Sequence, residues 1–132
     1  MKTLIVEDDF TSRLYLQELL KSYGPSHIAV NGKEAVDATR LALEAGAPYN
    51  LICLDIMMPQ MDGQQALKEI RAQEEAHRLL STSGGAKIVM TTALNDMKNA
   101  CNAFHSLCDA YLVKPIDGPK LLETLRQLAL IK

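Results

Sequence analysis

Short apolar runs alternate with longer segments of helical periodicity along these 132 residues, and this alternation constrains the fold more than any other feature. The expected strands are Thr3–Val6, His27–Val30, Leu51–Leu54, Ile88–Met90 and Ala110–Val113. The expected helices are Phe10–Tyr23, Lys33–Glu44, Gln64 to about Leu80, Asp96 to about Leu107 and Lys120 to about Leu130. Five strands that alternate with five helices predict an α/β fold with a mostly parallel sheet.

Composition limits the classes of protein to consider. With 48% hydrophobic residues the chain has enough apolar side chains for one domain over residues 1–132. The 14 basic and 16 acidic residues nearly balance, which argues against direct nucleic-acid binding. No apolar stretch is long enough for a signal peptide or a membrane helix, so we expect a cytoplasmic protein that does not bind membranes.

Polar residues follow four of the five expected strands. Three acids occupy positions 7–9 after the first strand, Asp55 follows the third, Thr92 ends the fourth, and Lys114 follows the fifth. Ligands bind at the carboxyl ends of the strands in sheets of this kind. We therefore expect these residues to converge on one crevice.

The residue types in that crevice favour metal-assisted phosphoryl chemistry. The carboxylates of Asp8, Asp9 and Asp55 would repel one another, and they are the hard oxygen ligands that Mg²⁺ prefers. Asp55, at the end of a buried strand, can attack a phosphoryl donor and form an aspartyl phosphate. Lys114 can pair with a phosphoryl oxygen as a point charge, and the Thr92 hydroxyl can donate a hydrogen bond to another.

Four motifs in order along the chain, L-I-V-E-D-D, L-D-I-M-M-P-Q-M-D-G, T-T-A and A-Y-L-V-K-P-I, extend this interpretation. The chain resembles the CheY-like receiver domains of two-component response regulators over essentially its whole length. The resemblance implies a flavodoxin-like (βα)5 fold, a doubly wound parallel sheet of five strands in the order 2-1-3-4-5.

The resemblance also implies roles at the metal site. Asp55 corresponds to the phosphoacceptor, and Asp8 and Asp9 to the acidic pair that holds Mg²⁺. Met57 occupies the position whose backbone carbonyl binds the metal, so its side-chain type matters little there.

A further set of roles concerns the response to phosphorylation. The resemblance implies that Thr92 is the switch hydroxyl and that Tyr111 is the switch aromatic, which turns inward when Thr92 moves toward the phosphoryl group. Lys114 matches the lysine of the family pattern, and the bond from Lys114 to Pro115 is expected to be cis.

The function that the resemblance implies is a phosphorylation switch. A sensor histidine kinase or a histidine phosphotransfer protein would donate a phosphoryl group to Asp55. The protein is then not a conventional enzyme but a phosphoacceptor that catalyses its own phosphorylation and dephosphorylation. We expect the output to be contact with a downstream protein through the face of the fourth helix, fifth strand and fifth helix. A homodimer is left open.

Three other functions remain to be weighed. A degenerate receiver would act as a binding scaffold independent of phosphorylation, but the set of site residues is intact. An aspartyl phosphatase would carry a second aspartate two residues after the nucleophile, where this chain has Met57. A flavin or nucleotide binder would need a phosphate-cradling loop after the first strand, where the acids at positions 7–9 would repel the ligand.

Overall fold

Five parallel strands form one sheet in a computed structural model of the chain, which describes residues 1–56, 63–77, 85–92 and 107–132. The strands are β1 (Thr3–Val6), β2 (Ser26–Ala29), β3 (Leu51–Asp55), β4 (Lys87–Thr92) and β5 (Ala110–Val113). Their order is β2-β1-β3-β4-β5, which confirms the predicted flavodoxin-like sheet.

The described residues contain four α-helices and one short 3-10 helix. These are α1 (Phe10–Leu20), η1 (Lys21–Tyr23), α2 (Gly32–Glu44), α3 (Gly63–Ala76) and α6 (Gly118–Gln127). The helix predicted from Asp96 to Leu107 falls almost entirely on residues 93–106, outside the described ranges. Within the described ranges, no helix is both long and apolar enough to cross a membrane.

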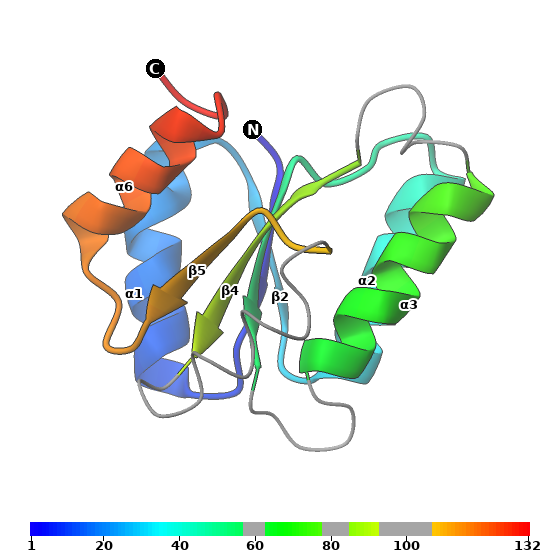
Figure 1. Cartoon of the computed structure of the whole chain (residues 1–132), viewed down its shortest axis with the longest axis horizontal. Helices are drawn as coiled ribbons and strands as arrows, with labels where there is room; N and C mark the ends of the chain where they lie inside the picture. The colour runs from blue at the N-terminus through cyan, green and yellow to red at the C-terminus, as the bar shows by residue number, and fades with distance from the viewer. Residues whose placement is uncertain (57–62, 78–84, 93–106) are drawn as a thin grey trace.

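The helices cover both faces of the sheet, α1 and α6 on one side and α2 and α3 on the other (Figure 1). Side chains on each strand alternate between these two layers. Leu4 and Val6 join the core under α2 and α3, whereas Ile5 joins the core under α1 and α6. This two-sided burial explains why the strands lack a polar alternation in the sequence.

Oxygen-bearing side chains set the starts of three helices. Asp9 Oδ2 accepts a hydrogen bond from the Ser12 amide at 2.8 Å, and Asn31 Oδ1 accepts one from the Glu34 amide at 2.8 Å. Asp117 caps α6 in the same way. Each cap satisfies an amide that the helix itself leaves without a partner.

The C-terminal helix ends three residues earlier than the predicted Leu130. Ala129 has a φ of 61°, a left-handed conformation that turns the backbone away from the helix axis. The amide of Leu130 then donates to the carbonyl of Leu125 at 3.0 Å, and the amide of Ala129 donates to the carbonyl of Arg126 at 3.0 Å. This hydrogen-bond pair is a Schellman ending, in which alanine stands where glycine is usual.

Candidate functional site

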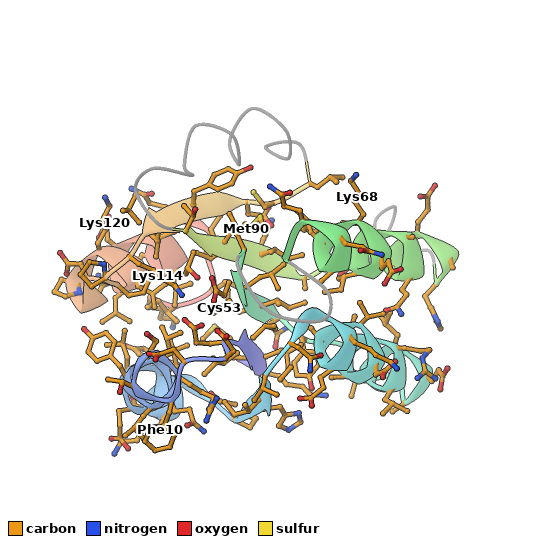
Figure 2. The ribbon with its side chains drawn as sticks, turned by 90° about the horizontal axis from the view of Figure 1, so that it is seen from below. Phe10, Cys53, Lys68, Met90, Lys114 and Lys120 are labelled. Atoms are coloured by element: carbon orange, nitrogen blue, oxygen red, sulfur yellow. The ribbon has the colours of Figure 1, made fainter. Side chains whose placement is uncertain are left out.

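Two acidic residues meet where β1 and β3 finish. Val6 pairs with Leu54 in the sheet, so the next residues along each strand, Glu7 and Asp55, lie level with each other. Both are almost fully buried, with 2% and 3% of their surface exposed. Figure 2 looks onto this end of the molecule, with Lys114 beside the strands and Phe10 at the outer side of α1.

Lys114 joins these two carboxylates. Its Nζ lies 2.8 Å from Glu7 Oε1 and 3.1 Å from Asp55 Oδ2. The backbone amide of Lys114 donates to the carbonyl of Thr92 at 2.8 Å, which extends the pairing of β5 with β4 by one residue. The lysine is therefore placed by the sheet and ties three strand ends together.

The electrostatics of this group are those of partly buried charges. Burial raises the pKa of Glu7, and the nearby Asp55 carboxylate raises it further, while Lys114 offsets part of the rise. Burial alone would lower the pKa of Lys114, but the hydrogen bonds and charges of Glu7 and Asp55 outweigh it and raise that pKa above its ordinary value. The ammonium form of Lys114 is thus stabilised by the acids around it.

A third carboxylate completes the group. One carboxylate oxygen from each of Glu7, Asp8 and Asp55 lies within 4.8 Å of the other two, and Asp8 is exposed to solvent. Lys114 supplies one positive charge against these three acids. Oxygen donors with excess negative charge and one open side suit a hard divalent cation such as Mg²⁺. The donor set therefore fits the metal that the sequence predicts.

The acidic pair differs from the expected one by a single position. Asp9 is exposed, and its carboxylate is engaged in capping α1, where the hydrogen bonds from Ser12 lower its pKa. The structure brings Asp8 and Asp55 together with Glu7, and Asp9 does not join them. The sequence does contain a signal for Glu7. The two apolar runs end at Val6 and Leu54, and if these ends are aligned, Glu7 is the acid that stands beside Asp55.

Two further predicted residues, Thr92 and Tyr111, lie on β4 and β5. Thr92 is buried at the end of β4, with 1% of its surface exposed. Tyr111 pairs with Met90 across β4 and β5 and packs against the core on the α2 and α3 side. The bond between Lys114 and Pro115 is cis, as expected. Met57 lies outside the described residues.

Comparison with known proteins decides the family. The chain matches the response regulator receiver domain family over residues 3–126. It belongs to that family. The chain is therefore a receiver domain of the response regulator type, and it spans only a small part of the length of the curated relatives that it matches.

Individual relatives agree with this assignment. The receiver is 34% identical over 123 residues to the osmosensing histidine protein kinase SLN1 of Saccharomyces cerevisiae, an alignment that covers 92% of this chain but only 9% of the kinase. It matches the Saccharomyces cerevisiae Ssk1 receiver domain, solved with the histidine phosphotransfer protein Ypd1, with a TM-score of 0.81 and 28% identity over 96% of this chain and 87% of that one.

Another solved relative is a receiver domain of a sensor histidine kinase from Pseudomonas aeruginosa. It has a TM-score of 0.75 and 26% identity, with 97% of each chain covered. That structure holds a magnesium ion coordinated in its active-site cleft.

A glycine after β3 lets α3 begin close to the receiver's site. The amide of Gly63 donates to the carbonyl of Ile56 at 2.9 Å. A Cβ at Gly63 would lie 2.3 Å from the Asp55 carbonyl oxygen, and that oxygen belongs to the backbone of a central strand. The start of α3 can therefore approach Asp55 this closely only without a side chain.

We predict that Gly63→Ala lowers the free energy of unfolding by about 1–3 kcal/mol, because either β3 or the start of α3 must shift. Urea denaturation followed by circular dichroism measures this change. Gly118→Ala is the matched control, since the added Cβ would meet side chains and no backbone atom. It would overlap Tyr15 Oη at 2.6 Å, which can rotate away, and touch Leu19 Cδ1 at 3.4 Å. Equal loss of stability in the two variants would contradict the steric argument.

Proposed function

We propose that this receiver accepts a phosphoryl group on Asp55 from the phosphohistidine of a sensor histidine kinase or histidine phosphotransfer protein. The observation that carries the proposal is the group formed by Glu7, Asp8 and Asp55 with the Lys114 ammonium. Three carboxylates face one ammonium group, so the site has an excess of negative charge that can bind a divalent cation. With the cation bound, the site suits the transfer of a negatively charged phosphoryl group. A cytoplasmic location remains a prediction from the sequence.

In the proposed transfer, a carboxylate oxygen of Asp55 attacks the phosphorus atom of the donor. A new O–P bond forms as the N–P bond of the phosphohistidine breaks, and the imidazole leaves with the bonding electron pair. Lys114 exchanges part of its ion pair with Asp55 for a phosphoryl oxygen, and the Thr92 hydroxyl donates a hydrogen bond to another. The product is an aspartyl phosphate at the end of β3.

The carboxylates of Glu7, Asp8 and Asp55 are the described residues that would hold Mg²⁺. When bound, the ion neutralises charge on the transferring phosphoryl group and on the acids themselves. Glu7 is proposed as a ligand in place of Asp9, which the sequence analysis predicted and which caps α1 instead. A ligand from the Met57 carbonyl remains a prediction.

The donor needs a surface beside this site, and α1 offers one. Phe10, Leu14 and Tyr15 are exposed by 65%, 46% and 44%, unusually high fractions for such large apolar side chains. A cavity of about 270 Å³ lies beside Tyr15. It is lined by Thr11, Ser12, Tyr15, Lys114, Pro115 and Ile116. We propose that the histidine-bearing helix of the donor packs on this surface, with its phosphohistidine directed at Asp55.

The downstream contact is proposed on a different surface. The sequence predicts it on the face of the fourth helix, fifth strand and fifth helix, of which β5 and α6 are described here. A homodimer remains an open possibility.

Incubation with Mg²⁺ and acetyl phosphate tests the phosphoacceptor proposal. We expect the intact mass to increase by one phosphoryl group, and we expect no increase for Asp55→Asn or in the presence of EDTA. Asp55→Asn replaces the nucleophilic carboxylate by a neutral amide, and EDTA removes the Mg²⁺ that the transfer requires.

A phosphoryl group that still attaches to the Asp55→Asn chain would contradict the assignment of the acceptor. No attachment from either acetyl phosphate or a phosphorylated histidine phosphotransfer protein would favour the degenerate scaffold instead.

Phe10→Ala tests the donor surface. With a histidine phosphotransfer protein that phosphorylates the wild-type chain, we expect transfer to slow by about tenfold or more, as for truncation of a central apolar anchor. Phosphorylation by acetyl phosphate should change less than about twofold, because this small donor needs no helix surface. Single-turnover kinetics with both donors measure the difference.

Leu41→Ala is the control, since Leu41 is exposed by 59% on α2, on the other side of the sheet. Equal rates for the Phe10 and Leu41 variants with the protein donor would place the docking surface elsewhere.

A further inference from the structure

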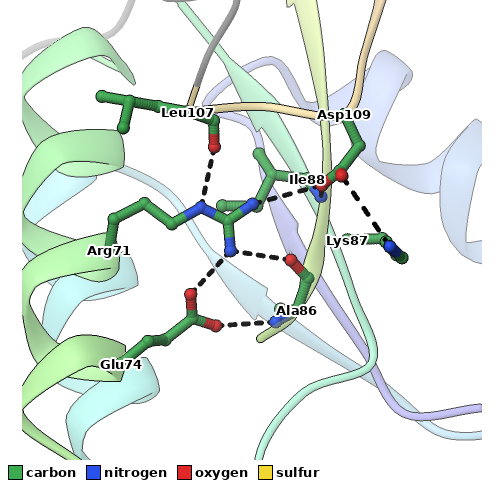
Figure 3. A network of polar contacts seen from close by, with 7 residues as sticks. All are labelled: Arg71, Glu74, Ala86, Lys87, Ile88, Leu107 and Asp109. Atoms are coloured by element: carbon green, nitrogen blue, oxygen red, sulfur yellow. Dashed lines mark hydrogen bonds and ion pairs between the residues drawn. The ribbon is translucent and has the colours of Figure 1, made fainter. Parts of the chain in front are cut away.

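A second charged cluster lies at the opposite end of the sheet, where β4 and β5 begin (Figure 3). It is centred on Arg71 and Glu74 of α3, whose side chains are exposed by only 11% and 2%. Neither residue takes part in the site around Asp55. Burying charged side chains to this extent costs desolvation energy. The contacts that Arg71 and Glu74 make in return are therefore of interest.

The Arg71 guanidinium contacts four groups from three segments of the chain. Nη1 lies 2.6 Å from Glu74 Oε1 and donates to the carbonyl of Ala86 at 2.8 Å. Nε donates to the carbonyl of Leu107 at 2.7 Å, and Nη2 lies 3.1 Å from Asp109 Oδ2. Arg71 thus holds the residues before β4 and the residues before β5 against α3.

Asp109 links the Arg71 contacts to the backbone of β4. Its Oδ2 also accepts from the Ile88 amide at 2.8 Å, and its own amide donates to the Ile88 carbonyl at 2.8 Å. The strand that follows, β5, lies at the edge of the described sheet and pairs with β4 alone. An edge strand of four residues has few backbone partners, so a charged anchor at its start has a large effect on its position.

The other end of β5 is held by Lys114, which contacts Glu7 and Asp55. The distance along an extended chain from Asp109 to Lys114 is about 16 Å. Charged contacts therefore hold both ends of the strand. Only the contacts of Lys114 involve Asp55, whereas the contacts of Arg71 involve Glu74, Ala86, Leu107 and Asp109.

We propose that Arg71 is a positioning residue for β5. It fixes the start of the strand, so that phosphorylation of Asp55 displaces the Lys114 end and not the whole strand. This inference rests on the proposed function, because it takes Asp55 as the phosphoacceptor.

The shape of the side chain supports this role over simple stabilisation. An apolar pair of similar volume would hold α3 on the sheet as well as a buried ion pair does. Only a planar fork of donors reaches the carbonyls of Ala86 and Leu107 and the Asp109 carboxylate at once. The role of Arg71 is thus to fix the register and direction of the strand start.

The test variant is the double replacement Arg71→Met with Glu74→Gln. In the wild type, the Ala86 amide donates to Glu74 Oε2 at 2.7 Å, and glutamine keeps an oxygen that can accept this hydrogen bond. Because both charges of the pair are removed together, neither is left buried without its partner. Arg40→Met on α2 is the control, because Arg40 is half exposed and its ion pairs with Asp37 and Glu44 lie on the surface.

Amide hydrogen exchange of residues 109–113, measured by NMR, is compared with and without Mg²⁺ and beryllofluoride, a mimic of the phosphoryl group. In the wild type and the Arg40 variant, we expect beryllofluoride to alter exchange near Lys114 while changing residues 109–110 by less than about twofold. In the double variant, residues 109–110 should exchange about tenfold faster or more and should respond to beryllofluoride.

Unchanged exchange of residues 109–110 in both states of the double variant would overturn the proposal. Faster exchange without any response to beryllofluoride would overturn it too, since Arg71 would then be a structural contact only. A wild type that does not respond to beryllofluoride would count against the proposed function itself. If the double variant does not fold, Asp109→Asn gives the same comparison, because it removes the charge that Arg71 reaches without changing size.

Discussion

The ion pairs of Lys114 with Glu7 and Asp55 are the interaction on which the site depends. Two carboxylates buried side by side would repel each other strongly without a cation between them. The lysine can occupy this place only because β5 lies beside β4, β4 beside β3, and β3 beside β1. The strand order thus brings the three charged residues together. An error in register by one residue would turn Glu7 or Asp55 away from Lys114.

The two ends of the sheet differ in how their charges are balanced. At the carboxyl ends of the strands, three acids and one lysine leave an excess of negative charge that suits a cation and a phosphoryl group. At the opposite end, Arg71 and Glu74 neutralise each other and satisfy the backbone of the segments before β4 and β5. The strand β5 connects the two ends, because Lys114 at its carboxyl end contacts Glu7 and Asp55 and Arg71 contacts the residues before its start.

Most of this arrangement follows from the sequence, because apolar runs ending in polar residues define both the strands and the edge where ligands bind. The choice between Glu7 and Asp9 did not follow, since three consecutive acids look alike until the pairing of Val6 with Leu54 is known. The end of α6 was also missed, because Ala129 adopts a conformation usually signalled by glycine. The Arg71 contacts join residues up to 38 positions apart, which no local pattern reveals.

Asp9 caps α1, and we propose that Glu7, Asp8 and Asp55 form one cation site. Titration with Mg²⁺, followed by the amide signals of residues 6–9 and 55, tests it directly in Asp8→Asn and Asp9→Asn chains. Asparagine caps a helix as well as aspartate does, so the second replacement removes charge without disturbing α1. We expect Asp8→Asn to weaken Mg²⁺ binding by about tenfold or more and Asp9→Asn to change it by less than about threefold. An equal loss of affinity in both variants would contradict it.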